Sequence, residues 1–325
     1  MATKRRKKKN QKKALKSLLS LAIVIILGLI AYFTEPWQYI DLDQGNTGNL
    51  SQAVELDESQ MAVYYIDVGQ ADSILIKMPT GENVLIDAGC ENDATKEDIE
   101  KYIQFIKDQG VETINYMFLT HPHYDHIGAA DDIILSDIKV ENIILPESDP
   151  LLWNNSKSAR ILDAMDAKDY TYDTCEPGTI YNIGDAVCTV LGPIGTDFSD
   201  KNDYSIVMRV VYGETEFLFT GDATTKSENS IVDEWGASAL ASDVLKVGHH
   251  GSNGSNGKKF LEAVSPSLAI ISVGKDNSYG HPGDKAMERI ENYTNAKVLR
   301  TDELGTIIIT SDGKNLSQVV LSAAG

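Results

Sequence analysis

Cysteine is scarce in this chain, with three residues among 325. An odd number cannot form a complete set of internal disulfides, which excludes a disulfide-stapled fold. Cys175 and Cys188 could pair in an oxidising compartment, but the favoured interpretation is that these two and Cys90 are small buried side chains. The chain also lacks an internal repeat of solenoid period, and its length allows a large hydrophobic core.

Acidic residues are absent before Glu35, where nine of the 29 basic residues lie between Lys4 and Lys16. The rest of the chain holds 20 basic and 48 acidic residues, a net charge of −28. This composition separates a basic tail from an acidic body. The body lacks the broad basic patch that is typical of nucleic-acid binding, since Lys258 and Lys259 offer only a small one.

Charge is missing altogether from Ser17 to Phe33, a mostly apolar run of 17 residues (SLLSLAIVIILGLIAYF). This length is at the short end for a bilayer span, and Ala31–Phe33 offers no small-x-small cleavage pattern. We therefore predict a single-pass cell-membrane protein with a signal anchor at 17–33. The basic tail at 1–16 stays cytoplasmic and the catalytic body lies outside. A cleaved signal peptide and a buried helix are the alternatives.

Thr34 to Gln60 is polar with little periodicity, which predicts a linker before a domain at 61–325. Strand-like runs then alternate with helical patterns, which predicts one layered α/β domain. The expected strands are 61–69, 72–78, 83–89, 114–120, 242–248, 267–274 and 305–310, with a hairpin at 204–213 and 215–222. The expected helices are 96–110, 227–236 and 283–294.

Histidine is also scarce, yet half of the six lie in one short stretch, FLTHPHYDHIGAA, at the end of a predicted strand. His121, His123 and His126 stand there beside Asp125. Nitrogen ligands with a carboxylate suit zinc, manganese or iron better than calcium or magnesium. A polar loop with chance histidines is the alternative, and the density argues against it. The stretch therefore predicts a metal site.

Two further strand ends carry candidate ligands. Asp222 closes the apolar run FLFTGDA, and burying its carboxylate costs free energy unless a cation or hydrogen bonds compensate. His249 and His250 close another run in LKVGHHGSNGS. Strand ends on one edge of a sheet converge, so we expect Asp222 and one of these histidines to join the first loop. Taken alone, Asp222 also fits an ordinary turn aspartate.

The motifs VLIDAG, HPHYDH, FTGD and GHHGS, in this order from Met61 onward, resemble those of the metallo-β-lactamase fold superfamily. The resemblance implies a four-layer αββα sandwich that holds two divalent metal ions, zinc or manganese, at one edge of its sheets. It implies His121 and His123 on one ion, and Asp125, His126 and either His249 or His250 on the second, with Asp222 as the bridge. Asp125 would also orient the nucleophile. Asp87 would support the histidines from behind.

Longer segments resemble the hydrolase domain of the DNA-internalisation competence protein (ComEC) family: YYIDVGQADSILIKMP, NDYSIVMRV, LKVGHHGSNGS and SVGKDNSYGHP. This implies a phosphodiesterase or nuclease that acts outside the membrane, with DNA among the candidate substrates. That family has a multi-helix membrane channel, whereas this chain has one predicted span and cannot form a DNA pore alone. The sequence identifies no protein partner.

The superfamily usually has one more histidine ligand, but no histidine lies between His126 and His249. The matching segment, SDKNDYSIV, offers Asn202 or Asp203 instead. An oxygen ligand there would shift the preference of the first site from zinc toward manganese. The alternative is one well-held metal ion and a weak second site.

Two other motifs carry candidate residues. His281 in YGHPGDK would protonate a leaving group or bind a phosphate, unless it is only a loop-end histidine. Asp67, with Gln70 and Asp72 in IDVGQADS, would line the rim of the site or serve as a turn residue. The favoured function is a metal-dependent phosphodiesterase. A cell-envelope esterase or phosphodiesterase of the teichoic-acid phosphorylcholine type and a weakly catalytic membrane-tethered binding module are the alternatives. A β-lactamase is disfavoured by the missing histidine.

Overall fold

The computed structural model describes residues 57, 59–147, 153–196 and 198–320. The predicted cytoplasmic tail, the predicted anchor at 17–33 and nearly all of the predicted linker lie outside the described residues. Within the described ranges, no helix is both long and apolar enough to cross a membrane.

Eight of the described strands form one sheet in the order β15-β14-β1-β2-β3-β4-β5-β6. The closely spaced runs after residue 60 are strands, as predicted, and the structure pairs them in an antiparallel meander: β1 (Met61–Tyr65), β2 (Ser73–Lys77) and β3 (Asn83–Ala88). From β3 the sheet continues in parallel through β4 (Thr113–Phe118), β5 (Lys139–Pro146) and β6 (Tyr172–Cys175). On the other side of β1 it is extended by β14 (Ile307–Ser311) and β15 (Leu316–Val320).

Seven more of the described strands form a second sheet in the order β13-β12-β11-β10-β9-β8-β7. Its antiparallel half is β7 (Ile180–Ile183), β8 (Ala186–Gly192), β9 (Val207–Tyr212) and β10 (Thr215–Phe219). Its parallel half adds β11 (Val244–Lys246), β12 (Leu268–Ile271) and β13 (Lys297–Arg300). The predicted hairpin is confirmed, because β9 and β10 pair with Tyr212 opposite Thr215.

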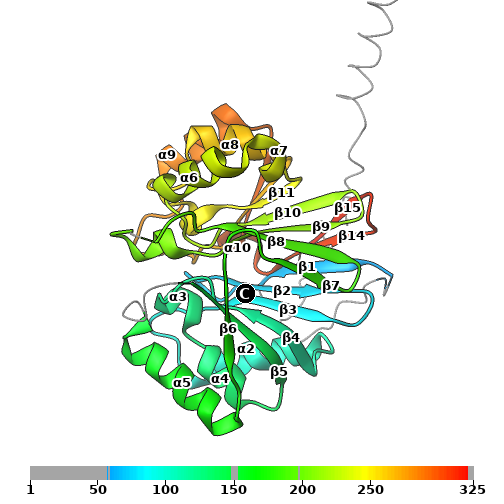
Figure 1. Ribbon diagram of the computed structural model, residues 1–325, viewed down its shortest axis with the longest axis vertical. Coiled ribbons are helices and arrows are strands. Elements are labelled where there is room, and N and C mark those ends of the chain that lie inside the picture. Colours follow the sequence, from blue (N-terminus) through cyan, green and yellow to red (C-terminus); the bar gives the residue numbers. More distant parts are fainter. Residues whose placement is uncertain (1–56, 58, 148–152, 197, 321–325) are drawn as a thin grey trace, which may run out of the picture. The chain divides into compact units, whose positions relative to one another are not determined.

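Helices cover the outer face of each sheet, so the molecule has four layers (Figure 1). The first sheet is covered by α2 (Lys96–Asp108), α4 (Ala130–Leu135) and α5 (Ser156–Lys168). The second is covered by α6 (Thr225–Trp235), α7 (Ala237–Leu240), α8 (Lys258–Val264) and α9 (Asp284–Tyr293). The short helices α3 (Tyr124–Ile127) and α10 (Thr301–Leu304) lie in connections. The predicted α/β sandwich of two sheets is confirmed.

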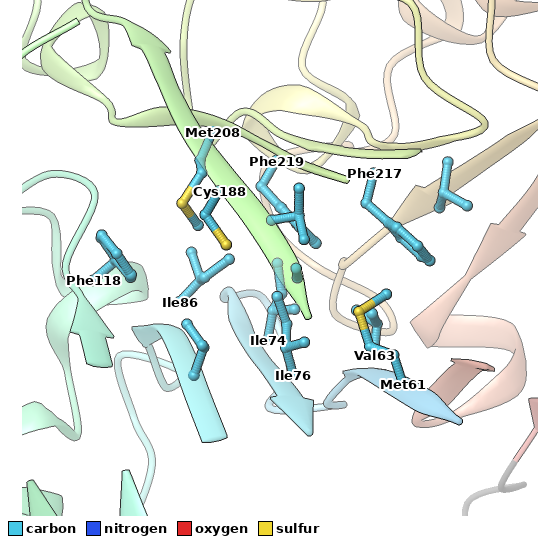
Figure 2. Packing of buried hydrophobic residues seen from close by; sticks show 14 of the residues in the cluster. Met61, Val63, Ile74, Ile76, Ile86, Phe118, Cys188, Met208, Phe217 and Phe219 are labelled. Carbon is cyan, nitrogen blue, oxygen red and sulfur yellow. The ribbon is translucent and has the colours of Figure 1, made fainter. Parts of the chain in front are cut away.

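Strand β1 shows why its sequence is continuously apolar. Successive side chains of a strand point to opposite faces. Met61 and Val63 face the second sheet and pack in one cluster with Phe217 (Figure 2), whereas Tyr64 packs edge-on against Phe105 of α2. Both faces of β1 are therefore buried. Burying one large apolar side chain stabilises the fold by roughly 1.5–3 kcal/mol.

Local sequence sets the bounds of α2. The Thr95 hydroxyl accepts from the amide of Asp98, and the Asp98 carboxylate accepts from the amide of Thr95, so the helix begins with a reciprocal cap. It ends at Asp108, two residues before the end that we expected. The three cysteines lie in the described residues and are buried and free, as the favoured interpretation held.

Candidate metal centre

Three loops that each follow a strand meet at one edge of the sheets. The first follows β4 and carries His121, the second follows β10 and carries Asp222, and the third follows β11 as the short helix η3 (Gly248–Gly251). Three groups of potential ligands occur among the described residues, each with its ligand atoms within 4.8 Å of one another, and two of them share Asp222. The first donor group is His121, His123 and Asp222. The second donor group is Asp125, His126, Asp222 and His250.

The carboxylate of Asp222 links the two donor groups. Its Oδ1 lies 3.0 Å from Nε2 of His126 and 3.7 Å from Nε2 of His250. Its Oδ2 lies 3.8 Å from Nε2 of His121, which is 3.0 Å from Nδ1 of His123. In the second group, Nε2 of His250 is also 3.3 Å from Oδ2 of Asp125. One side chain can therefore bridge two cations.

Unpaired polar atoms show that the two groups fit a cation. Nε2 of His126, Nε2 of His250 and both carboxylate oxygens of Asp222 are buried and have no partner of hydrogen-bond geometry in the described structure. Such groups cost free energy when they are left unpaired away from water. Imidazole nitrogens that converge with carboxylate oxygens are the donor set of a first-row transition metal such as zinc or manganese.

Asp87 lies on the far side of His126 from Asp222 and holds the ring of His126 by a hydrogen bond. Its Oδ2 accepts from Nδ1 of His126 at 2.7 Å and from the hydroxyl of Thr120 at 2.8 Å, and its Oδ1 accepts from the amide of Thr120 at 2.7 Å. These bonds fix the ring of His126 so that its Nε2 faces Asp222. Asp87 has a φ of 60°, a left-handed conformation uncommon for a non-glycine residue.

The structure distinguishes the two adjacent histidines of η3. Both have a left-handed backbone, with φ of 53° for His249 and 51° for His250. His250 is buried, and its Nδ1 donates to the carbonyl of Ser272 at 3.0 Å, which leaves Nε2 facing the second donor group. Nε2 of His249 lies 3.5 Å from Oδ2 of Asp222, but His249 belongs to none of the ligand groups among the described residues.

The buried charges of the site shift the pKa values of one another. Burial disfavours a protonated imidazole, but Asp222 and Asp72 outweigh it and raise the pKa of His250 to about 10. Burial has the same effect on His126, yet Asp222 and Asp87 hold its pKa well above the ordinary value. Burial opposes ionisation of Asp222, but His126 and His250 hold its pKa well below the usual range. A cation bound by these residues would displace protons from the imidazoles, so we expect metal binding to depend on pH.

The segment expected to replace the missing histidine lies in η2 (Lys201–Tyr204), beside the site. Ser205, which follows it, has its Oγ 3.3 Å from Nδ1 of His121 and accepts from the amide of Asp222 at 3.0 Å. The carboxylate of Asp203 accepts from the hydroxyl of Thr224, and Asp203 joins none of the described ligand groups. Asn202 is buried and its Oδ1 is unpaired among the described residues, so Asn202 is the freer oxygen donor.

Asp67 and Gln70 have different environments. Asp67 donates its amide to Thr306 at 3.0 Å and accepts from the amide of Gly69 at 3.2 Å, as a turn residue does, and it lies outside the ligand groups of the described chain. Gln70 accepts from the amide of Gly274 at 3.0 Å, and its Nε2 lies 3.4 Å from Nδ1 of His281. Gln70 thus holds the loop that carries His281.

His281 lies at the rim of the site. Its ring centroid is 5.7 Å from that of His249 and 6.5 Å from that of His250. Its ring stacks on Tyr279, whose side chain is 60% exposed. Burial, together with His250 and His249, lowers the pKa of His281 to about 4, so that this imidazole is neutral near pH 7.

Sequence reasoning passed over several residues of the site. Thr120 and Ser205 contact Asp87 and His121 through short hydroxyl side chains, and Ser272 contacts His250 through its backbone carbonyl. These contacts depend on the fold and leave no pattern in the sequence. Lys246 left a signal, because it is a lysine inside the apolar run VLKV, and it is fully buried. Tyr279 carried no signal beyond its place two residues before His281.

Comparisons with known proteins agree with this geometry. Residues 66–275 match the family model described as the Metallo-beta-lactamase superfamily. ComE operon protein 3 of Bacillus subtilis is 32% identical over 261 residues, which cover 77% of this chain and 33% of that protein. Competence protein ComA of Neisseria gonorrhoeae is 30% identical over 294 residues, which cover 89% of this chain and 38% of that protein. The chain therefore spans only about a third of the length of these relatives.

A solved structure supports the fold. The metallo-beta-lactamase fold protein YhfI from Bacillus subtilis superposes with a TM-score of 0.51 and 11% sequence identity. The match covers 78% of this chain and 100% of that one.

Proposed function

We propose a function from the premise that this chain belongs to the metallo-β-lactamase superfamily: it is a metal-dependent hydrolase that cleaves phosphodiesters. The observation that carries the proposal is the pair of donor groups that share Asp222. When bound, a pair of divalent cations stabilises the attacking and leaving oxygens of an in-line displacement and lowers the pKa of water. The similarity to competence proteins supports a phosphodiester substrate, with DNA among the candidates.

Residues of both donor groups have assigned roles. His121, His123 and Asp222 would hold one ion, and Asp125, His126, His250 and Asp222 the other. Asn202 would add an oxygen donor to the first ion, which favours manganese over zinc there. His249, whose Nε2 lies 3.5 Å from Oδ2 of Asp222, would be a ligand of neither ion.

Two side chains would act on the substrate itself. His250, whose Nε2 lies 3.3 Å from Oδ2 of Asp125, and the charge of His126 outweigh burial and lower the pKa of Asp125 to about 2, so its carboxylate is ionised and can accept a hydrogen bond from the attacking water. His281 is neutral near pH 7. With Gln70 donating to its Nδ1, its Nε2–H can donate to a phosphoryl oxygen. His281 would therefore bind the phosphate rather than protonate the leaving group.

The acidic body restricts the substrate. A net charge of −28 over the chain after the basic tail repels long polyanions. The ends of DNA strands, or short phosphodiesters, carry less negative charge near the site than duplex DNA does, so they suit this acidic body better. We propose that the segment 17–33 anchors the enzyme in the cell membrane and that catalysis takes place on the outer side.

Phosphodiesterase assays of the purified chain test the proposal. We expect hydrolysis of bis-p-nitrophenyl phosphate and of single-stranded DNA after loading with Mn²⁺ or Zn²⁺, and loss of activity on chelation. A preparation that binds neither metal and cleaves neither substrate would contradict it.

A second candidate substrate is a phosphodiester with a cationic head group. A cavity of about 340 Å³ lies beside Gln70, which donates its amide to Glu91 of the cavity wall at 3.1 Å. Asp67, Asp93 and Asp98 also line it, together with Lys101 and the aromatic residues Tyr102 and Phe105, so its carboxylates outnumber its one lysine. Carboxylates and aromatic faces favour quaternary ammonium groups. Faster cleavage of choline-phosphate esters than of DNA would select this candidate.

A further inference from the structure

We propose that Asp72 and Lys246 form a buried pair that positions His250, and that this pair sets the affinity of the second donor group for its cation. The inference rests on the proposed metal-dependent function and adds two positioning residues to it. These residues come from different sheets: Asp72 precedes β2, and Lys246 ends β11.

The two side chains are paired away from solvent. Lys246 is 0% exposed and Asp72 is 1% exposed. Nζ of Lys246 lies 2.8 Å from Oδ2 of Asp72 and donates to the carbonyl of Val247 at 3.1 Å. A lysine is rarely buried this completely unless it is paired. The ion pair between Lys246 and Asp72 therefore belongs to the buried interior next to the donor groups.

Asp72 contacts two members of the second donor group. Its Oδ1 lies 3.3 Å from Nδ1 of His250, on the side of the ring opposite the donor atom Nε2. Its amide donates to the carbonyl of Asp125 at 2.9 Å, and its own carbonyl accepts from the amide of Gly89 at 2.9 Å. Oδ1 of Asp72 makes no hydrogen bond of normal geometry among the described residues, and Nδ1 of His250 donates to the carbonyl of Ser272. Asp72 therefore acts on the ring of His250 through its charge at 3.3 Å, and it holds the backbone that carries Asp125 through its own amide.

Lys246 explains why Asp72 would position His250 and would not itself bind the cation. Asp72, Asp87 and His126 form a third set of ligand atoms within 4.8 Å of one another, so Asp72 lies close enough to compete for a cation. The ammonium of Lys246 occupies Oδ2 of Asp72 and offsets its charge. Oδ1 of Asp72 is then left facing Nδ1 of His250, where its negative charge favours the observed orientation of the ring. The buried lysine keeps a carboxylate near the site from becoming a ligand.

The test replaces the pair without leaving a buried charge alone. In the full-length chain we would make the double variant Asp72→Asn/Lys246→Met. The matched control is Arg209→Met/Glu216→Gln, which removes the ion pair of 2.6 Å across the neighbouring strands β9 and β10, outside the described ligand groups. Metal content would be measured by mass spectrometry, and dissociation constants for Zn²⁺ and Mn²⁺ by competition with a chelator.

We expect the double variant to bind one ion about 10- to 100-fold more weakly, the range known for residues that orient metal ligands, and the other ion as the wild type does. In the Co²⁺-loaded protein, the absorption of one site should change while that of the other is retained. The control should match the wild type in both measurements. A folded double variant with two wild-type affinities and an unchanged spectrum would overturn the inference.

Two further outcomes are decisive. If the double variant does not melt cooperatively, Asp72→Asn alone replaces it, because the amide keeps the shape of the side chain and removes the charge that faces His250. An unchanged affinity for both ions in that folded variant would again overturn the inference. A wild-type chain that binds no metal would contradict the proposed function itself, whereas two bound ions unaffected by these variants would contradict only the role of the pair.

Discussion

Oδ1 of Asp222 lies 3.0 Å from Nε2 of His126, and neither of these two atoms has a partner of hydrogen-bond geometry among the described residues. A carboxylate oxygen and an imidazole nitrogen that are buried, unpaired and this close together are typical of two ligands that face one cation. Asp222 belongs to both donor groups, so its two oxygens connect them. This relationship makes Asp222 the most sensitive residue of the site.

Asp222→Asn keeps the shape of the side chain and removes its charge. We expect the two ions to be lost together or to bind far more weakly, with phosphodiesterase activity reduced more than about 100-fold, beyond the effect of a residue that only orients a ligand. Metal content and the hydrolysis rate of bis-p-nitrophenyl phosphate measure this. Full activity with both ions retained would refute the bridging role.

The adjacent histidines of η3 should behave differently. His250→Ala removes a member of the second donor group and should leave the chain with fewer bound ions. His249→Ala removes a ring outside that group and should leave the metal content unchanged. His249→Ala is thus the matched control for His250→Ala, and metal analysis of the two variants decides. Equal losses in both would show that the ligand assignment is wrong.

The positions of the ligands were readable in the sequence because each ends an apolar run. His121, Asp222 and His250 follow β4, β10 and β11, and the resemblance to a known family supplied their order. Asp67 shows the limit of this reasoning. In IDVGQADS, the chain pattern could not distinguish Asp67, a turn residue, from Asp72, which contacts His250. That contact depends on how the two sheets pack, and local sequence does not encode it.

The elements between residues 130 and 192 also escaped prediction. There α4, α5 and the strands β5 to β8 follow one another, and much of their surface is exposed or interrupted by polar residues. β6 (YDTC) and β7 (IYNI) lie at the outer ends of their sheets. Short edge strands bury little apolar surface, so they lack the apolar runs that identified β9 and β10.

The stability of the metal-free protein should fall as the pH rises. The folded pKa of His250 is raised to about 10 from an ordinary 6.5, so the protonated ring contributes stability that is fully present below pH 6.5. This contribution is lost as the pH rises from 6.5 toward 10. Urea unfolding in EDTA at pH 6, 8 and 9.5 measures the trend. A bound cation replaces the proton, so the metal-loaded protein should not share this loss, and equal slopes in the two forms would contradict the prediction.

Tyr279 offers a test of the substrate class. Its exposed ring stacks on His281, which places a free aromatic face at the rim of the site. If the substrate is a nucleic acid, Tyr279→Ala should raise the KM for thymidine 5′-p-nitrophenyl phosphate roughly 5- to 100-fold, the range expected for one lost base stack. The KM for methyl p-nitrophenyl phosphate, which has no base, should not change. Tyr279→Phe should retain both values, and an equal rise for the two substrates in Tyr279→Ala would argue against base stacking.

Asn202 should determine which metal the first donor group prefers. This residue is buried in η2, in the segment that matches the place of the superfamily's usual histidine, and its Oδ1 has no partner among the described residues. Replacing an oxygen donor with an imidazole favours the softer cation. Asn202→His should therefore raise the affinity for Zn²⁺ relative to Mn²⁺, and Asp203→Asn, which changes a carboxylate already bonded to Thr224, should leave that ratio unchanged. Competition between the two metals, followed by metal analysis, measures the ratio. If Asp203→Asn shifts the preference and Asn202→His does not, then Asp203 is the oxygen that replaces the missing histidine.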